Sequence, residues 1–339
     1  MIRYFTDVPL KKHHTFGNEV FAKHFFEFTE AEDLPTFLST NKEWPDSKIL
    51  ILGGGSNLLF VDDFPGLIIY PNIPGIEIVN EDRNNVWLKV GAGVGWDQLV
   101  EYAVFNNWGG IENLSLIPGK VGASAVQNIG AYGMEVQNQI ESVYGFDLDT
   151  ESAYTIEGFE CQFAYRDSIF KKLFKNHFII TSVVFKLDKF PEYILNYANL
   201  KGEVEKLGEV NLRNIRQTVI RIRESKLPDP AVLGNAGSFF KNPIVDASLA
   251  EDLLDDHPAM THYPATEGKI KLAAGWLIEQ CGWKGFRRGD VGVHDKQALV
   301  LVNYGNATGR EIYDLSEEIK QSVVAKFSVE LEREVNVIG

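Results

Sequence analysis

The sequence is short of cysteine and of long apolar stretches. Only two of its 339 residues are cysteines, Cys161 and Cys281. Two are too few for a disulfide scaffold or a cysteine-based metal site, so we expect free thiols in a reducing compartment. No stretch approaches the roughly 18 apolar residues of a membrane-spanning helix, and residues 1–14 lack the apolar core of a signal peptide. We therefore expect a cytoplasmic protein.

Clusters of basic residues are missing as well. The chain has 33 Lys and Arg against 47 Asp and Glu, a net charge of −14, and its sequence pI is about 5.0. We therefore expect neither nucleic acid nor an anionic membrane as a partner. The seven histidines include the pair His13 and His14, but none follows a metal-ligand spacing such as HExxH. The sequence thus predicts no metal site.

Hydrophobic residues make up 45% of the chain and charged residues 24%, as in globular proteins. The length suggests two or three domains, with a boundary within about residues 190–212. Strands and helices are both predicted, so the fold class is α+β. The expected strands are 48–52, 86–90, 177–187 and 331–339, and the expected helices are 96–106, 211–225, 248–256, 271–281 and 309–327.

Two glycine-rich segments are candidates for ligand binding. The string LGGGSNLL at 52–59 follows an expected strand, and its exposed backbone N–H groups would suit phosphate oxygens. It lacks the endings of a P-loop or a Rossmann turn, and a tight surface turn is the alternative. The string IPGKVGASAVQNIGAYG at 117–133 can lie flat against a ligand, with the amides of Gln127 and Asn128 reaching a flavin edge. Its alternative is an irregular loop.

Three polar residues are candidates for chemistry. Arg166, in YRDSIF, could bind a carboxylate or stabilise an enolate oxygen; a salt bridge with Asp167 is the alternative. Ser238 follows Gly237 in GNAGSFFKNP and could deliver a proton, although it could equally be a turn serine. Glu334 would share a strand face with Glu332, and taken alone it is a solvated surface acid.

In combination and in this order, the segments closely resemble the UDP-N-acetylenolpyruvoylglucosamine reductase (UDP-N-acetylmuramate dehydrogenase) family. The likeness runs over residues 15–339 and rests on the strings LGGGSNLL, IPGKVGASAVQNIGAYG, YRDSIFK, KLPDP, GNAGSFFKNP, AAGWLIEQCGWKG and LEREVNVIG. Tyr197 in LNYANL matches the tyrosine of the longer, type I form of the family. The resemblance implies a bacterial, NADPH-dependent flavoenzyme of peptidoglycan precursor synthesis.

The resemblance also implies a fold and its parts. An FAD-binding region of the vanillyl-alcohol-oxidase (PCMH) type, made of two α/β lobes, would precede a C-terminal α+β substrate-binding domain. The expected spans are 1–70 for the first lobe, 71–205 for the second, 206–328 for the C-terminal domain and 329–339 for a strand returning to the active site. The expected ligands are non-covalent FAD, NADPH and UDP-N-acetylglucosamine enolpyruvate, bound by a monomer.

Residue roles follow from matching positions in the family. The catalytic residues would be Arg166, which polarises the substrate, the acid Ser238, and Glu334. The residues expected to bind the cofactor are Gly53, Gly54, Gly55, Ser56, Asn57, Pro118, Gly119, Gly122, Ala123, Ser124, Gln127, Asn128, Gly130, Ala131 and Tyr132. Those expected to bind the substrate are Tyr197, Lys226, Asn242, Lys284 and Gln297.

In the implied reaction, NADPH reduces the flavin, whose N5 then gives hydride to C3 of the enolpyruvyl group. Arg166 would oppose the enolate charge and Ser238 would protonate C2, while Glu334 would be protonated or share a proton with the carboxylate. Two rival functions stay open. One is a flavin oxidase on the same scaffold; a covalent His or Cys link is disfavoured because neither residue occurs between His24 and Cys161. The other is a non-catalytic sugar-nucleotide-binding protein.

Overall fold

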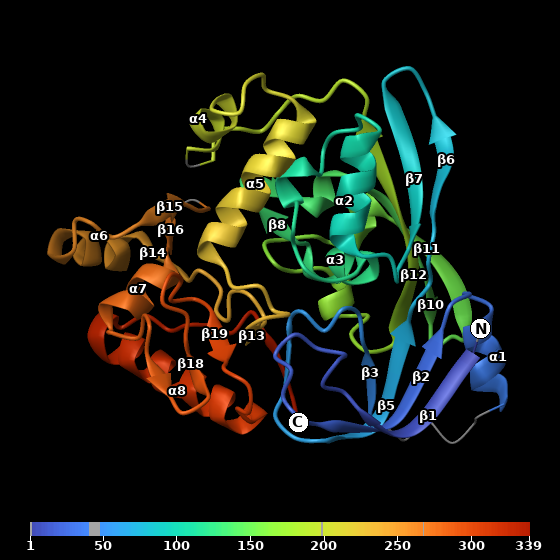
Figure 1. Cartoon of the computed structure of the whole chain (residues 1–339), viewed down its shortest axis with the longest axis horizontal. Helices are drawn as coiled ribbons and strands as arrows, with labels where there is room; N and C mark the ends of the chain where they lie inside the picture. Colours follow the sequence, from blue (N-terminus) through green and yellow to red (C-terminus); the bar gives the residue numbers. More distant parts are fainter. Residues whose placement is uncertain (1, 41–47, 198, 267) are drawn as a thin grey trace. The chain divides into compact units, whose positions relative to one another are not determined.

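The computed structural model describes residues 2–40, 48–197, 199–266 and 268–339. The chain divides into two compact units, each of which gathers distant parts of the sequence (Figure 1). Unit 1 comprises Met1–Val8, Ala22–Gly54 and Pro65–Ser225, and unit 2 comprises Pro9–Phe21, Gly55–Phe64 and Lys226–Gly339. These bounds do not follow the four spans expected from the sequence, which stay predictions.

The described residues of unit 1 form two larger sheets and one two-stranded sheet. The first has the order β1-β2-β5-β3, with β1 at Ile2–Pro9, β2 at Phe21–Phe28, β5 at Phe64–Pro71 and β3 at Ile49–Ile51. Strands β3 and β5 pair in parallel. Helix α1 (Asp33–Thr40) contributes Leu34 and Phe37 to a core with Phe26 and Phe28 of β2. The short strand β3 confirms the expectation for 48–52 and runs directly into the glycine turn.

The second sheet of unit 1 is antiparallel, with the order β11-β10-β12-β7-β6. Its strands are β11 (Ser152–Glu157), β10 (Ile140–Asp147), β12 (Phe178–Asp188), β7 (Asn85–Gly91) and β6 (Ile76–Glu81). Eight consecutive residues of β12 are buried, as its β-branched and aromatic run predicts for a central strand. Helices α2 (Trp96–Phe105) and α3 (Val121–Gln127) pack on one face of this sheet (Figure 1).

The remaining elements of unit 1 are short, apart from one helix. Helices α4 (Leu200–Glu205) and α5 (Leu212–Lys226) share a small apolar core, to which α5 contributes Ile215 and Val219, as its spacing predicts. The others are β8 (Gly130–Ala131), β9 (Met134–Glu135) and the 3₁₀ turns η1 (Glu112–Leu114), η2 (Val136–Asn138), η3 (Gly158–Cys161) and η4 (Ile169–Lys171).

Unit 2 contains two small sheets and three helices. The sheets are β13-β19-β18-β17 (Gly234–Asn235, Leu301–Asn303, Val291–Val293, Arg287–Arg288) and β14-β16-β15 (Ile244–Asp246, Lys269–Leu272, His262–Pro264). The helices are α6 (Ala247–Asp256), α7 (Ala274–Gln280) and α8 (Gly309–Phe327). A further parallel pair joins β4 (Leu58–Phe60) to β20 (Asn336–Ile338), so the C-terminal strand pairs with the strand that follows the glycine turn.

Most of the expected elements are confirmed within a residue or two, but two are corrected. The helix expected at 271–281 begins only at Ala274, because Lys271 and Leu272 belong to β16, which pairs with β14 and β15. The C-terminal strand expected at 331–339 is shorter than expected and forms only at Asn336–Ile338. The chain bends at Glu334 and Val335, so the expected alternation of faces does not hold there. No helix of the described residues has the length and apolarity needed to cross a membrane.

Candidate active site

The two glycine-rich segments pack against each other in unit 1. A Cβ atom on Gly53 would lie 2.9 Å from the Cβ of Ala123, and one on Gly54 would lie 2.8 Å from the Cα of Gly119. A Cβ atom on Gly122 would likewise lie 2.9 Å from the Cβ of Ala92. Side chains are therefore excluded here and the peptide groups form the surface. This is the kind of backbone cradle that phosphate oxygens occupy.

The glycine turn continues in unit 2, where Gly55 has a positive φ of 61°. A Cβ there would lie 2.1 Å from the carbonyl oxygen of His13 and 2.6 Å from the Cα of His14. Only glycine satisfies both the conformation and the approach. His14 is buried, packs edge-on against Phe60, and has its pKa lowered to about 4 by burial. The histidine pair supports this turn.

Asn57, next in the turn, is linked to the C-terminal segment. Its side-chain amide donates to the carbonyl oxygen of Glu334 at 3.0 Å, and its own carbonyl accepts from the backbone N–H of Asn336 at 3.1 Å. The pairing of β4 with β20 extends this connection. Glu334 is thereby fixed beside the residue that closes the glycine turn, as expected of a C-terminal strand.

Ser238 and Glu334 are brought together by backbone hydrogen bonds. The N–H of Glu334 donates to the carbonyl of Phe239 at 2.9 Å, and the N–H of Lys241 donates to that of Glu332 at the same distance. Ser238 follows Gly237, whose φ is 69°. Both Ser238 and Glu334 are half-buried, and within the described residues the Ser238 hydroxyl makes no hydrogen bond. The hydroxyl group of Ser238 and the carboxyl group of Glu334 thus lie on two paired segments of unit 2.

Arg166 lies at the tip of a tight turn in unit 1. Ala164 and Asp167 exchange both backbone hydrogen bonds at 3.0 Å, and Arg166 itself has a positive φ of 55°. Its Nη2 donates to the carbonyl of Gly130 at 2.6 Å. The carboxylate of Asp167 pairs with Lys172, and that pairing lowers its pKa against the opposing effect of burial. Arg166 is therefore held against the second glycine-rich segment.

The side chains of that second segment are largely engaged within the chain. The Ser124 hydroxyl donates to the carbonyl of Val121, and the Gln127 amide oxygen accepts from Lys171. The Asn128 side chain is fully buried with every polar atom hydrogen-bonded. Pro118, Gly119, Gly130 and Ala131 offer backbone instead. If this segment lies along the flavin, its peptide groups and Tyr132 are what it presents.

The residues expected to bind substrate fall in both units. In unit 1 the half-exposed ring of Tyr197 packs edge-on against Tyr132 at 5.9 Å, and burial raises the pKa of Tyr132. In unit 2 the Asn242 side chain accepts from the N–H of Ala274 at the start of α7. Gln297 lies against Gly275 of the same helix. Lys226 ends α5 and is exposed, and Lys284 is an exposed partner of Glu279 at 2.9 Å.

Several side chains of unit 1 that belong to no recognisable motif anchor α5 and the second glycine-rich segment. Arg216 binds Asp97 through both carboxylate oxygens, at 2.6 and 2.9 Å, which anchors α5 to α2. Arg223 follows at i+7 on the same helix, and its buried Nε has no partner among the described residues. Glu135 and Lys171 hold side chains of the second glycine-rich segment. The only sequence signal for these was the arginine spacing along 211–225.

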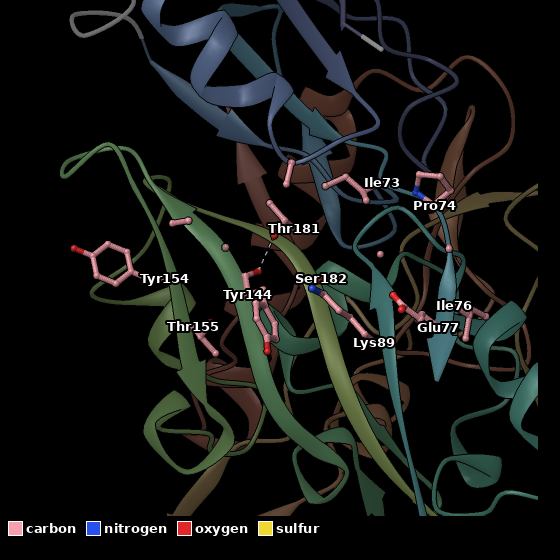
Figure 2. Close-up of a pocket in the computed structure, with 15 residues that line it drawn as sticks. Ile73, Pro74, Ile76, Glu77, Lys89, Tyr144, Tyr154, Thr155, Thr181 and Ser182 are labelled. Carbon is pink, nitrogen blue, oxygen red and sulfur yellow. Dashed lines mark hydrogen bonds between the residues drawn. The ribbon is translucent and has the colours of Figure 1, made fainter. Parts of the chain in front are cut away.

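A cavity of about 460 Å³ opens elsewhere in unit 1, on the five-stranded sheet (Figure 2). Lys89 lies over the ring of Tyr144 there, and the Thr181 hydroxyl donates to the Tyr144 carbonyl at 3.2 Å. None of its lining residues is among the expected site residues. Away from the cavity, Asp147, Asp149 and His177 place possible metal-ligand atoms within 4.8 Å of one another. This surface group was not foreseen from the sequence.

The described residues fit FAD by one structural criterion. At Gly53 and Gly54 the cradle has no space for any side chain, although nothing in the local strand geometry requires glycine. Close backbone approach on both sides is what a bound diphosphate needs. In unit 1, Gly53 and Gly54 together with Pro118–Ala123 would hold the diphosphate, and 127–132 would lie along the flavin.

Comparisons with known proteins cover the whole chain. Residues 229–338 match the family model "UDP-N-acetylenolpyruvoylglucosamine reductase, C-terminal domain", and residues 22–151 match the model of an FAD binding domain. The reductase of Chromobacterium violaceum is 47% identical over 98% of both chains. Those of Flavobacterium johnsoniae and Neisseria gonorrhoeae are 47% and 46% identical, covering 98% and 99% of this chain and 99% and 97% of theirs.

A solved structure supports the same assignment at the level of fold. The crystal structure of UDP-N-acetylenolpyruvylglucosamine reductase from Thermus caldophilus matches with a TM-score of 0.67 at 24% identity, covering 100% of this chain and 99% of that one. It confirms the α+β class, and the two family models place an FAD binding domain before the C-terminal domain. From the near-complete matches at 46–47% identity, the chain belongs to the UDP-N-acetylenolpyruvoylglucosamine reductase family.

Proposed function

We propose that this protein reduces UDP-N-acetylglucosamine enolpyruvate to UDP-N-acetylmuramate, a step of peptidoglycan precursor synthesis, with NADPH as the reductant and FAD as the bound cofactor. The similarity to the reductases extends over nearly all of the chain and includes the FAD binding domain. The observation that supports the residue roles is the backbone hydrogen bond from Glu334 to Phe239, the neighbour of Ser238, beside the glycine turn.

FAD held by the backbone cradle would supply a hydride, received from NADPH, to C3 of the enolpyruvyl double bond. Negative charge then develops at C2 and spreads into the adjacent carboxylate. Arg166 opposes that charge with a guanidinium whose direction is fixed by its bond to Gly130. A preorganised cation costs no reorganisation when the charge appears, which makes this type of stabilisation effective.

Ser238 protonates C2. Its hydroxyl has no hydrogen-bond partner among the described residues, so it can turn toward a ligand. The addition of one hydride and one proton saturates the double bond, and the serine regains its proton from solvent. General acid catalysis by a positioned group contributes about 10²–10⁴ in rate.

Glu334 acts in its protonated form, or shares one proton with the substrate carboxylate. An ionised side chain beside a developing enolate would raise the barrier, whereas a shared proton orients the carboxylate without adding charge. Glu334→Gln tests this role. We expect it to lower turnover, because an amide cannot pass on the shared proton; full turnover would exclude proton sharing.

Cations concentrated near the ligands would allow an acidic chain to bind two anionic molecules. Lys226, Lys284 and Arg166 supply that potential, and the backbone cradle binds phosphate without any charge of its own. Tyr197, Asn242 and Gln297 complete the substrate contacts. We further propose that the protein is cytoplasmic, since both cysteines are free thiols. We also propose that it is a monomer. Analytical ultracentrifugation would test the monomer.

Product analysis tests the reaction. The purified protein is incubated with NADPH and UDP-N-acetylglucosamine enolpyruvate, the absorbance at 340 nm is followed, and the sugar nucleotide is weighed by mass spectrometry. We expect one NADPH to be oxidised for each nucleotide that gains two hydrogens. NADPH oxidation that requires air and leaves the nucleotide unchanged would indicate an oxidase. Binding without NADPH oxidation would indicate a non-catalytic sugar-nucleotide-binding protein.

A further inference from the structure

Asn128 was expected to contact the flavin, but its side chain faces the interior of unit 1. The residue is fully buried, ends α3 and has a positive φ of 42°. Its Nδ2 donates to the Glu135 carboxylate and to the carbonyl of Ala164, each at 2.8 Å, and its Oδ1 accepts from the N–H of Gln137 at 3.2 Å. These bonds use both amide hydrogens, so Nδ2 has no donor left for a ligand.

One of these partners is the base of the Arg166 turn. Ala164 pairs with Asp167 across the turn, and its carbonyl oxygen points to Asn128. With a φ of 55°, Arg166 lies in the left-handed region, which is unfavourable for a residue with a side chain. Such a conformation persists only when the surrounding contacts determine it. Asn128 provides one of those contacts from a different segment.

Other bonds join the same two segments. The Ser168 hydroxyl donates to the carbonyl of Val126 at 2.8 Å, and Lys171 donates to the carbonyl of Arg166 at 3.0 Å and to Gln127 at 3.3 Å. These partners lie at the end of α3 or on the turn itself. The bond from Asn128 differs from them because it reaches Ala164, which pairs with Asp167 across the turn.

Glu135 fixes the Asn128 amide in this orientation. Its carboxylate accepts from Asn128 at 2.8 Å and from the Gln137 side chain at 2.6 Å. Glu135 also lies against Gly130, the residue that Arg166 binds. A Cβ on Gly130 would be 2.9 Å from Nη1 of Arg166 and 3.0 Å from Cγ of Glu135. The side chains of Glu135 and Arg166 thus both lie against Gly130.

We propose that Asn128, oriented by Glu135, is a positioning residue for Arg166: it holds the arginine turn at its base and makes no side-chain contact with the flavin. The inference rests on the proposed function, in which Arg166 faces the substrate carboxylate. It predicts that loss of the Asn128 donor slows only the step that depends on Arg166.

The test uses Asn128→Asp in the FAD-loaded enzyme, because the substitution keeps the shape and removes the donor. Flavin reduction by NADPH and flavin reoxidation by the enolpyruvyl nucleotide are followed separately by stopped flow. We expect reoxidation to slow by about 10–100-fold, as small misplacements of a catalytic group do, with the flavin spectrum and reduction rate near those of wild type. Asn138→Asp, the same change at an exposed nearby position, should leave both rates unchanged.

A double-mutant cycle separates positioning from a general structural effect. In an Arg166→Gln background, Asn128→Asp should cause no further loss, because residues acting through one another are not additive. An equal loss in both backgrounds would overturn the inference, and so would an altered flavin spectrum with normal reoxidation. If wild-type enzyme is not reoxidised by the nucleotide, the proposed function fails instead.

A swap keeps the test usable if Asn128→Asp loses FAD. In the double variant Asn128→Asp with Glu135→Gln, the new amide can donate to the new carboxylate, but the Ala164 carbonyl still lacks its donor. We expect this variant to retain FAD while reoxidation remains slow. Wild-type reoxidation in the swap would overturn the inference, because it would show that the bond to Ala164 is dispensable.

Discussion

The two segments that carry the proposed catalytic residues are held in different ways. The Arg166 turn of unit 1 is fixed mainly by side chains, those of Asn128, Ser168 and Lys171. The segment of unit 2 with Ser238 and Glu334 is fixed mainly by backbone hydrogen bonds between 239–241 and 332–335. Substitutions around Arg166 should therefore disturb geometry, whereas substitution of Ser238 should remove chemistry and leave geometry intact.

We expect the largest effect from substitution of Ser238, which should remove chemistry without disturbing geometry. Ser238→Ala removes the proton donor, while the backbone bonds that place it do not involve the side chain. We expect reoxidation of reduced flavin by the enolpyruvyl nucleotide to fall by about 10²–10⁴. FAD content and reduction by NADPH should be those of wild type. Wild-type reoxidation in a stopped-flow trace would refute the serine assignment.

A second prediction concerns the glycine cradle, where the two glycine-rich segments meet through their backbones. Gly54→Ala would push a methyl group against the backbone of Gly119, at 2.8 Å, so the two segments must separate. We expect FAD affinity to fall on the order of 10²-fold, since the misfit lies where the diphosphate would be held. Gly95→Ala is the matched control, because Gly95 has φ of −61° and its nearest neighbour would be 3.6 Å away.

FAD affinity is measured for both variants by equilibrium titration of the apoprotein. Equal FAD affinity of the Gly54→Ala and Gly95→Ala variants would contradict the assignment of the cradle to the cofactor.

A third prediction concerns pH and the support of the turn in unit 2. His14 is neutral when folded, with a pKa lowered to about 4 from 6.5, because burial disfavours the charged ring. The unfolded chain therefore binds more protons between these values. The His14 contribution to the unfolding free energy should fall by about 1.4 kcal/mol per pH unit as the pH drops from 6.5 toward 4.

The contribution of His14 is isolated by comparison with His14→Gln, because carboxylates titrate in the same range. Denaturant unfolding at several pH values should show a shallower pH dependence for the variant. Parallel curves for the two proteins would show that His14 is not buried in its neutral form.

The smallest expected effect concerns the cap of a helix. Thr308 caps α8 in unit 2, where it and Glu311 form a reciprocal pair of side-chain-to-backbone bonds. Thr308→Ala should cost about 1 kcal/mol of unfolding free energy, as loss of a helix cap does. Reoxidation kinetics should be unchanged. A slowed reoxidation would mean that the backbone-held segment responds to distant stability changes, which weakens the contrast drawn here.

Local patterns predicted much of the fold and less of the site. The strand at 177–187 and the helices at 96–106 and 309–327 were confirmed, because their apolar spacing decides their burial. The predicted start of α7 at Lys271 was wrong. Pairing of β16 with β14 and β15 prevails over the helical periodicity of 271–273. The C-terminal strand is shorter than expected because the chain bends at Glu334 and Val335.

Contacts between distant segments could not be read from one sequence. The approach of Gly54 to Gly119 and the bond from Asn57 to Glu334 depend on the tertiary fold, and no spacing rule foretells them. Asn128 illustrates the limit: an amide in a glycine-rich segment suggested a ligand contact, but burial and three internal partners assign it to the chain.

The most direct test follows the two half-reactions in the absence of oxygen. NADPH is added to the FAD-loaded enzyme until the visible flavin absorbance is lost, and UDP-N-acetylglucosamine enolpyruvate is then mixed in. We predict rapid return of the oxidised flavin spectrum, in step with formation of UDP-N-acetylmuramate. Flavin that stays reduced until air is admitted would contradict the proposed reaction and indicate an oxidase on the same fold.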